Sequence, residues 1–322
     1  MYKLEKSITN IIKYIYGGKN KTVNIGYGID DNYARCTGTS IASICLNNKN
    51  MNFSFHIIAA NFSVSTKEKF KILAEQYRIN INIYEIDINC LKDLPTKRNL
   101  PISMYFRLIL PILLYDIKQI IYLDADVICL NSIDKLININ MEEYIIGAVP
   151  DLKKINEERI KSLKLNNHIY FNSGVLLINN DKWNTFNTVE KVLMILNKDE
   201  LKETLLFPDQ DALNIVLTQN IKYLSSEYNC IDIDSIDKYS IVFLHFTASP
   251  KPWHLAWSVN RQCNKFNVNL YQEYEKKTPW VNTPLVLPRD YKEMEYFSKD
   301  LRKAGKYMMS LKWYIRYLLK KI

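Results

Sequence analysis

Short apolar runs alternate with longer stretches of helical periodicity along the first part of the chain. A mostly apolar run of about four to eight residues is typical of a buried strand, and apolar residues three or four positions apart are typical of an amphipathic helix. Strands that alternate with helices favour an α/β fold, in which a mostly parallel sheet carries helices on both faces. The pattern predicts strands at 22–27, 53–60, 81–88 and 119–123, and helices at 33–47, 67–77 and 103–114.

The later part of the chain continues this alternation and then changes character. Strands are predicted at 144–149 and 170–178, a helix from Asp181, and a short strand at 241–244 that ends on His245. A further helix opens at Pro208-Asp209-Gln210-Asp211, with Asp209 placed as its N-cap. After Pro284 the chain becomes helical and basic. The predicted organisation is a lead segment at 1–21, one main domain at 22–283 and a C-terminal extension at 284–322.

Two carboxylates follow the strand predicted at 119–123. Asp124 and Asp126 are separated by Ala125, and in an extended chain their side chains point to the same side. Hard oxygen ligands of this kind suit a divalent cation such as Mg²⁺ or Mn²⁺, and ligands of open α/β sheets gather beyond the carboxyl ends of the strands. The pattern predicts a metal together with an anionic, phosphorylated substrate. The same spacing recurs at Asp209 and Asp232, where a solvated turn is the ordinary explanation.

Other polar residues near strand ends could bind ligands, and each also has a structural explanation. His245 could complete a metal site or be a hydrogen-bonded histidine at a strand end. Lys251, between two prolines, could contact a diphosphate or be a surface lysine. The run Asp30-Asp31-Asn32 could hold a ribose and a base edge, or form a turn with an N-cap. Asn172 lies in a predicted buried strand, where its amide needs a partner such as a sugar hydroxyl.

The composition indicates a globular protein and excludes several classes. The chain has 322 residues, of which 48% are hydrophobic. No apolar run approaches the about 18 residues that span a bilayer, and residues 1–21 lack a secretory apolar segment, so a cytoplasmic location is expected. Six dispersed cysteines predict free thiols in a reducing compartment. Gly26-Tyr27-Gly28 lacks the third glycine of a dinucleotide fingerprint, which disfavours NAD binding.

The positive charge is concentrated at the C-terminal end. Of the net charge of +9, seven charges lie between Leu301 and Ile322, where no acidic residue occurs, leaving +2 for the rest. Apolar residues at helical spacing, among them Leu311 and Ile315, share this segment with aromatic residues. A basic amphipathic helix of this kind predicts binding to an anionic membrane surface; the alternative is a helix packed on the protein with solvated charges. Charge confined to one helix argues against a nucleic acid partner.

Six segments, taken together and in order, resemble glycosyltransferase family 8, and within it the bacterial lipopolysaccharide core glucosyl- and galactosyltransferases. The resemblance covers residues 23–257, and the chain from Pro284 is similar to the extension of several core transferases. The segments are NIGYGIDDNY at 24–33, MYFR at 104–107, YLDAD at 122–126, YFNSGV at 170–175, PDQD at 208–211 and HFTASPKPWH at 245–254.

The resemblance implies a GT-A fold, with 22–283 as the catalytic domain, and transfer from UDP-glucose or UDP-galactose with retention of the α configuration. It implies that Asp124, Asp126 and His245 hold Mn²⁺ or Mg²⁺. Residues implied in catalysis are Asp151, Asp209 and Gln210. Residues implied in binding the nucleotide and donor are Gly28, Asp30, Asp31, Asn32, Arg107, Asp124, Ala125, Asn172, Ala248 and Lys251.

Two positions shape the expected chemistry. Ala248 stands where the family usually has a glycine, at a point where the backbone approaches phosphate. Gln210 stands where a nucleophile on the β face is expected, and an amide is a poor nucleophile. We therefore expect same-face attack, with the leaving phosphate accepting the acceptor's proton while Gln210 and Asp209 steady an oxocarbenium-like sugar.

The predicted function is metal-dependent transfer of glucose or galactose from a UDP-sugar to the lipopolysaccharide outer core. The enzyme is expected to be peripheral on the inner face of the bacterial inner membrane. Donor identity and an α-1,2 or α-1,3 linkage stay open. The alternatives are the same chemistry on another glycan acceptor, and a sugar-nucleotide-binding protein without turnover.

Overall fold

The computed structural model describes residues 7–18, 21–97, 101–166, 169–233, 236–260 and 265–321. The chain forms two compact units, Met1–His245 and Phe246–Ile322. The sequence placed a boundary at residue 284 instead, and the assignment of functional domains stays a prediction. The cysteines that the structure describes, Cys36, Cys45, Cys90, Cys129 and Cys230, are free thiols, whereas Cys263 lies outside the described residues.

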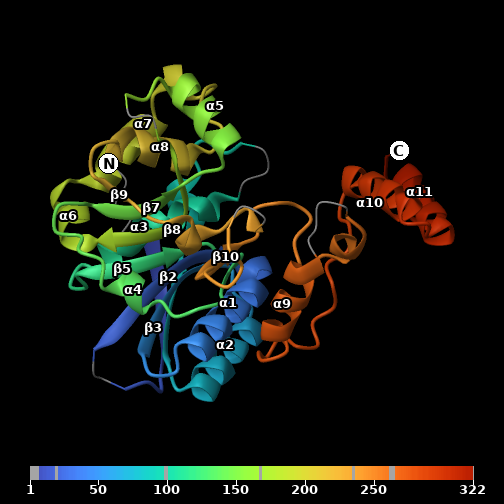
Figure 1. Ribbon diagram of the computed structural model, residues 1–322, viewed down its shortest axis with the longest axis horizontal. Helices are drawn as coiled ribbons and strands as arrows, with labels where there is room; N and C mark the ends of the chain where they lie inside the picture. Colours follow the sequence, from blue (N-terminus) through green and yellow to red (C-terminus); the bar gives the residue numbers. More distant parts are fainter. Residues whose placement is uncertain are drawn as a thin grey trace. The chain divides into compact units, whose positions relative to one another are not determined.

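The first unit is built on an eight-stranded sheet (Figure 1). Its strands are β1 (Ile8–Ile15), β2 (Thr22–Asp30), β3 (Asn52–Ala60), β4 (Asn80–Ile86), β5 (Gln119–Leu123), β7 (Ile146–Pro150), β8 (Phe171–Asn179) and β9 (Ile221–Tyr223). They follow the order β1-β4-β3-β2-β5-β8-β7-β9. The β4-β3-β2-β5 core and the β7-β9 pair are parallel, whereas β1, β5 and β7 meet β4, β8 and β8 in antiparallel pairs. The predicted mostly parallel α/β sheet is confirmed.

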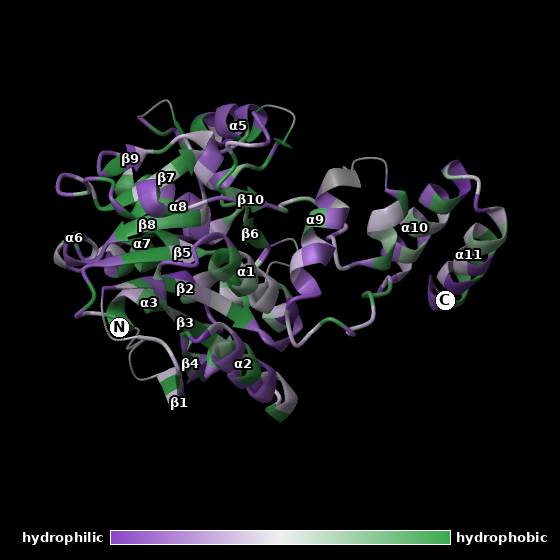
Figure 2. Cartoon of the chain, turned by 60° about the horizontal axis from the view of Figure 1, so that its bottom comes forward, coloured by the Kyte–Doolittle hydropathy of each residue, from purple (hydrophilic) through white to green (hydrophobic). Residues whose placement is uncertain are grey.

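Helices cover both faces of this sheet, as the alternating pattern predicted. Helices α1 and α2 lie on one face, and α3 with α6 to α8 pack on the other, over strands that are hydrophobic along much of their length (Figure 2). The helices are α1 (Ala34–Asn47), α2 (Val64–Tyr77), α3 (Phe106–Leu113), α4 (Asp134–Ile137), α5 (Lys153–Leu163), α6 (Asn180–Thr185), α7 (Thr188–Leu196) and α8 (Pro208–Leu217). Short 3₁₀ helices include η2 (Asp31–Tyr33), η4 (Ile102–Tyr105) and η6 (Ser226–Asn229).

Strand β1 falls inside the predicted lead segment, and the sequence analysis missed it. The strand pairs only with β4 and forms an edge of the sheet, so it buries little side-chain area. Ile11 and Ile15 are about half exposed, at 50% and 57%. An edge strand that hides few side chains gives no clear alternation of apolar and polar residues, which is the signal that sequence reasoning depends on.

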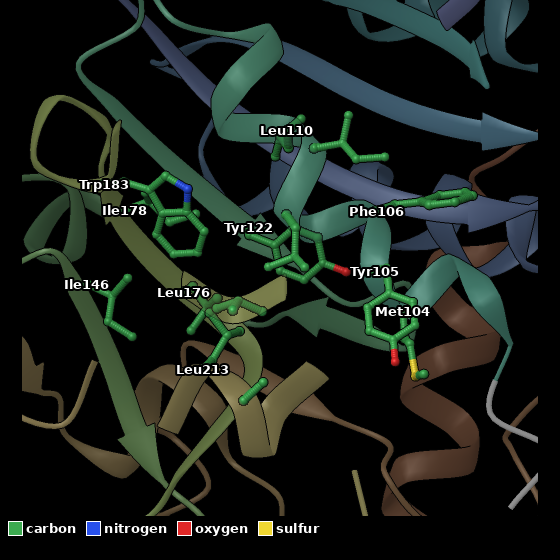
Figure 3. Close-up of a cluster of buried hydrophobic side chains, with 14 of the residues drawn as sticks. Met104, Tyr105, Phe106, Leu110, Tyr122, Ile146, Leu176, Ile178, Trp183 and Leu213 are labelled. Atoms are coloured by element: carbon green, nitrogen blue, oxygen red, sulfur yellow. The ribbon is translucent and has the colours of Figure 1, made fainter. Parts of the chain in front are cut away.

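One apolar cluster fixes the α3 face of the sheet against the strand ends (Figure 3). Tyr122 of β5 and Leu176 of β8 pack there with Leu110 of α3 and Leu213 of α8. The close approach of α3 to β2 depends on Gly28, because a β-carbon at that position would lie 2.5 Å from Cβ of Phe106. This packing sets the position of the residue that follows Phe106, Arg107.

The second unit is helical, with η8 (Leu255–Val259), α9 (Lys265–Glu275), α10 (Tyr291–Lys303) and α11 (Tyr307–Lys321). The helical extension predicted after Pro284 is confirmed, whereas α9 was not predicted. Phe297 and Leu301 of α10 pack against Trp313 and Tyr317 of α11. The side chain of Asp290 caps α10 by accepting a hydrogen bond from Glu293 N. Among the described residues, no helix is both long enough and apolar enough to cross a membrane.

Candidate active site

The two carboxylates that follow β5 lie together with a histidine from a distant part of the chain. Asp124 directly follows β5, and after Asp126 the chain forms β6 (Val127–Cys129), which pairs antiparallel with β10 (Phe243–His245). In this register His245 lies opposite Val127. Its Nε2 is 3.2 Å from Oδ1 of Asp126 and 3.9 Å from Oδ2 of Asp124. One ligand atom from each of the three residues lies within 4.8 Å of the other two.

This donor set fits a divalent cation. Two carboxylates and an imidazole nitrogen are ligands that Mn²⁺ and Mg²⁺ sites use, with the imidazole favouring a transition metal. Gly174 of β8 leaves room for them, since a β-carbon there would lie 2.2 Å from Cε1 of His245 and 2.8 Å from Oδ2 of Asp124. The structure therefore brings together all three residues that the resemblance implied as metal ligands.

Arg107, at the start of α3, is buried and connects the acidic residues of the site. Its Nη2 donates to Oδ1 of Asp124 at 2.8 Å, and its Nε lies 3.0 Å from Oδ2 of Asp209. The phenol of Tyr122 also donates to Oδ1 of Asp124, at 3.0 Å. Burial raises the pKa of Asp209, and Arg107 opposes that shift. A buried arginine between two carboxylates fixes their positions and balances their charge.

Gln210 is held by four hydrogen bonds that use both ends of its amide. Its Oε1 accepts from N and Oγ of Ser173, at 2.9 Å and 3.2 Å. Its Nε2 donates to Oδ2 of Asp151 at 2.9 Å and to the phenol oxygen of Tyr170 at 3.1 Å. Ser173 in turn receives a hydrogen bond from Nη1 of Arg107 at its carbonyl oxygen, at 2.6 Å. The amide of Gln210 therefore has one fixed orientation.

The predicted N-cap role of Asp209 is wrong. Pro208 occupies the first turn of α8, Asp209 lies inside the helix, and Phe207 at the N-cap makes no side-chain capping bond. Asp211 satisfies the preceding backbone instead, because its Oδ2 accepts from the N–H groups of Leu206 and Phe207. Proline is preferred at the first helical position, and this shifts the helix start upstream of Asp209. Asp209 is thereby free to pair with Arg107.

A cavity of about 210 Å³ opens over these residues. It is bounded by the end of β2, by η4 and α3, by the strand end of β5 and by the start of α8. Asp151 joins the site by accepting hydrogen bonds from Gln210 and Asn172, and Asn172 also accepts from the backbone N of Gly174. The predicted site residues in the cavity wall are Gly28, Arg107, Asp124, Ala125, Asp126, Asp209 and Gln210.

The acidic run after β2 is used locally. Oδ1 of Asp30 accepts hydrogen bonds from the backbone N of Asn32 and Tyr33, and thus caps η2. Asp31 accepts from the backbone N of Ser63. Tyr33, which follows the run, lines the cavity, and burial followed by the charge of Asp126 raises the pKa of its phenol. The predicted roles of Asp30, Asp31 and Asn32 in nucleotide binding stay predictions.

Two predicted nucleotide-binding residues, Ala248 and Lys251, belong to the second unit. The Nζ of Lys251 donates a hydrogen bond to the carbonyl oxygen of Phe246. Phe246 packs edge-on against Trp257 and Tyr271. The roles of Ala248 and Lys251 toward phosphate stay predictions.

Sequence reasoning missed Asn229, Ser173 and Tyr122 as parts of the site. Asn229 follows no sequence signal, because it lies in the 3₁₀ helix η6 and reaches His245 only through the fold: its Oδ1 is 2.9 Å from Nδ1 of His245. Tyr122 and Ser173 lie inside recognised segments, but their side chains were read as strand and not as site.

Comparison with known proteins agrees with this geometry. The family model "Glycosyl transferase family 8" matches residues 24–256, and "Glycosyl transferase family 8 C-terminal" matches residues 267–321. Lipopolysaccharide glucosyltransferase WaaO of Escherichia coli (strain K12) is 30% identical, covering 94% of this chain and 92% of that protein. Lipopolysaccharide 1,3-galactosyltransferase of Salmonella typhimurium (strain LT2) is also 30% identical, covering 100% and 98%.

A solved structure supports the same assignment of fold. The galactosyltransferase LgtC, in complex with donor and acceptor sugar analogs, superposes with a TM-score of 0.70 at 22% identity, over 81% of this chain and 98% of that chain. The protein therefore has the GT-A fold of glycosyltransferases. The family model covers most of the chain, and the chain belongs to glycosyltransferase family 8.

Proposed function

We propose that this protein is a metal-dependent, retaining hexosyltransferase that moves glucose or galactose from a UDP-sugar to the outer core of lipopolysaccharide. The observation that carries the proposal is the single cavity in which Asp124 and Asp126 lie with Gln210 and Asp209. The curated relatives that match almost end to end are named as lipopolysaccharide glucosyl- and galactosyltransferases. Two of the relatives are named lipopolysaccharide 1,2-glucosyltransferase and one 1,3-galactosyltransferase, so the linkage is left open between 1,2 and 1,3.

The residues that would hold Mn²⁺ or Mg²⁺ are Asp124, Asp126 and His245. A divalent cation bound there would offset the negative charge that builds on the diphosphate of a departing UDP group. Arg107 keeps Asp124 in place through its 2.8 Å ion pair. Ala125 and Gly28 line the cavity with a methyl group and with bare backbone, which leaves space for the donor.

Retention through same-face attack fits the way the two polar residues of α8 are held. Gln210 already uses its carbonyl and amino groups within the protein, and an amide is a poor nucleophile. Asp209 is buried and paired with Arg107, and burial raises its pKa. We therefore assign both residues to steadying the positive charge of an oxocarbenium-like sugar, with the leaving phosphate accepting the proton of the acceptor hydroxyl.

The C-terminal helix suits an enzyme whose acceptor is a lipid. On α11 the side chains of Trp313 and Tyr317 pack on α10, but a second apolar stripe stays exposed. Met308 and Leu319 of this stripe are 83% and 72% exposed. Basic residues flank it, which favours an anionic surface such as the inner face of the bacterial inner membrane.

The test is hydrolysis and transfer of a panel of UDP-sugars with Mn²⁺, with Mg²⁺ and with a chelator. We expect one UDP-hexose to be turned over only with metal, and Asp126→Asn to abolish that turnover. Asp134→Asn, which removes an acid at the start of α4, is the matched control and should keep full activity. Proton NMR of the product should show an α anomer.

Three outcomes would contradict parts of the proposal. No turnover together with no UDP binding would contradict the transferase assignment as a whole. A glycosyl adduct trapped on Asp209 or Asp151 would replace same-face attack with a covalent mechanism. Transfer to another glycan and not to lipopolysaccharide core would move the enzyme to a different acceptor.

A further inference from the structure

The geometry points to Asn229 as a positioning residue that holds His245 with its proton on Nδ1, so that the lone pair of Nε2 faces Asp124 and Asp126. The direction of the Asn229 amide is imposed through Asn172 by Asp151 and by the backbone of Gly174. The inference rests on the proposed metal site and adds residues of this chain that act on it without touching a metal.

The hydrogen bonds that lead to His245 begin at two groups whose donor or acceptor role is fixed by their chemistry. The backbone N–H of Gly174 can only donate, and it lies 3.0 Å from Oδ1 of Asn172. An ionised carboxylate can only accept, and Oδ2 of Asp151 lies 3.1 Å from Nδ2 of Asn172. Both ends of the Asn172 amide are therefore fixed, with its oxygen toward Gly174 and its nitrogen toward Asp151.

The same logic carries to the histidine. Oδ1 of Asn172 can only accept, so the group of Asn229 that lies 2.9 Å away must be its Nδ2. The oxygen of Asn229 then faces Nδ1 of His245, at 2.9 Å. A carbonyl oxygen accepts, and Nδ1 must therefore carry the proton. In the neutral imidazole Nε2 is then a lone pair directed at two carboxylates, an arrangement that calls for a cation between them.

The burial of these groups makes the alternative orientation expensive. Asn229 is 2% exposed, and His245 and Asn172 are 5% and 8% exposed. If the Asn229 amide were reversed, its oxygen would face Oδ1 of Asn172, and its amino group would require the His245 proton to lie on Nε2, toward Asp126. Buried polar groups without partners destabilise a protein, so the network selects one orientation.

Asp151 orients the second amide of the site through the same oxygen. Its Oδ2 accepts from Nε2 of Gln210 at 2.9 Å as well as from Asn172, and its Oδ1 accepts from the backbone N of Leu152. The carboxylate of Asp151 thus sets the direction of the Gln210 amide. Through Asn172 it also sets the direction of the Asn229 amide that contacts His245. Asp151 acts by positioning other groups.

The first test reads the tautomer directly and needs no turnover. The chain has four histidines, so a sample labelled with ¹⁵N-histidine gives few ring signals, and His245→Asn assigns the one of interest. In the metal-free protein, at a pH where the ring is neutral, we expect long-range ¹H–¹⁵N spectra to show His245 protonated at Nδ1; metal is left out because a cation on Nε2 would force that tautomer by itself. Asn229→Leu should abolish that preference, whereas Asn229→Asp should keep it, because a carboxylate still accepts from Nδ1, although its second oxygen then faces Oδ1 of Asn172 and lowers stability. Protonation at Nε2 in the wild type, or an unchanged tautomer in Asn229→Leu, would overturn the inference.

The second test measures Mn²⁺ affinity from the electron paramagnetic resonance signal of free Mn²⁺. Loss of a partner that orients a ligand typically weakens metal binding by about 10- to 100-fold, and we expect that loss in Asn229→Leu but not in Asn229→Asp. Asp151→Ala should weaken binding less, because Gly174 still orients Asn172. Asn180→Leu removes a fully buried asparagine whose side chain bonds Leu114 O and Nδ2 of Asn184, away from the site, and should leave affinity unchanged.

The two tests separate this inference from the proposed function. If the wild type does not bind Mn²⁺ at all, the proposed metal site fails, whatever the tautomer. If the wild type binds Mn²⁺ and Asn229→Leu binds it equally well, the metal site stands and the positioning role of Asn229 is refuted. A loss of affinity in Asn180→Leu as large as in Asn229→Leu would refute it too, since general destabilisation would then explain both.

Discussion

A β-carbon on Gly174 would lie 2.2 Å from Cε1 of His245, closer than carbon atoms approach in folded proteins. Strand β8 therefore passes directly beneath the imidazole, and only a residue without a side chain leaves His245 where it can meet Asp124 and Asp126. The glycine of the segment YFNSGV is explained here by space and not by backbone conformation.

The first prediction concerns this contact. Gly174→Ala should displace His245 or Asp124 and weaken Mn²⁺ binding by at least about tenfold, because ligands held out of place lose their common geometry. Isothermal titration with Mn²⁺ measures the change. Gly147→Ala in the neighbouring strand β7 is the matched control, since its β-carbon would meet only side chains of Leu224 and Leu177, at 3.2 Å and 3.3 Å. Equal affinity in the two variants would contradict the steric argument.

The second prediction concerns Asp211, the acid of the PDQD segment that pairs with Arg159. Asp211 is fully buried and accepts from Nε and Nη2 of Arg159, at 3.1 Å and 2.8 Å, and from the phenol of Tyr170 at 2.6 Å. Asp211→Asn leaves the Arg159 charge without its partner and should lower the free energy of unfolding by about 3 kcal/mol. Urea denaturation measures this loss.

Asp199→Asn is the control for that measurement. It breaks an ion pair with Lys202 in which the aspartate side chain is 91% exposed, and exposed pairs of this kind contribute little. A similar loss of stability in both variants would mean that the buried Arg159–Asp211 pair contributes no more to the free energy of unfolding than the exposed pair does.

The third prediction concerns membrane binding by α11. Replacing Leu311, Ile315 and Leu319 by serine removes exposed apolar side chains and leaves the packed face of the helix intact. Since each buried apolar side chain contributes about 1.5 kcal/mol or more, partition onto anionic vesicles should fall more than about 100-fold. Flotation with vesicles measures this, and hydrolysis of the UDP-sugar should persist.

Substitution tests this better than truncation, because removing α11 would also expose Phe297 and Leu301 of α10. Met194→Ser, which removes an exposed apolar side chain from the first unit, should leave flotation unchanged. Unaltered flotation of the triple variant would mean that α11 is not the membrane-binding element.

The fourth prediction is a dependence of stability on pH that arises far from the candidate metal ligands. His56 in β3 is buried between Asn24 and Tyr84, at 3.1 Å from each, and burial followed by the charge of Lys13 lowers its pKa from 6.5 to about 4. Between these pH values His56 is protonated in the unfolded chain and neutral in the folded protein. The free energy of unfolding therefore falls as the pH drops from 6.5 toward 4.

The full shift corresponds to about 3 kcal/mol. Urea denaturation at pH 7 and pH 4.5 should show a smaller difference in His56→Gln than in the wild type, since carboxylates titrate in both proteins. The same pH dependence in both would contradict the assignment to His56.

The order of the main strands and helices could be predicted from the chain alone, because buried strands and amphipathic helices have a periodicity that is visible without knowledge of contacts. Strand β5 was predicted with the bounds that it has, Gln119–Leu123, and the acidic residues that follow it were predicted as metal ligands, which the structure brings together with His245. The periodicity could not show β1, whose side chains are largely exposed at an edge of the sheet. It also could not show the true start of α8, where Pro208 and not Asp209 begins the first turn.

The contacts between polar residues, in contrast, depend on how the strands are arranged in the fold. His245 reaches Asp126 because β10 pairs with β6, across 119 positions of the chain, and Asn229 reaches His245 from a 3₁₀ helix with no sequence signature. Hydrogen bonds act over about 3 Å and are indifferent to separation along the chain. Local pattern therefore predicts which segments become strands, whereas the partners of Arg107, Gln210 and His245 are set by how those strands are arranged in the sheet.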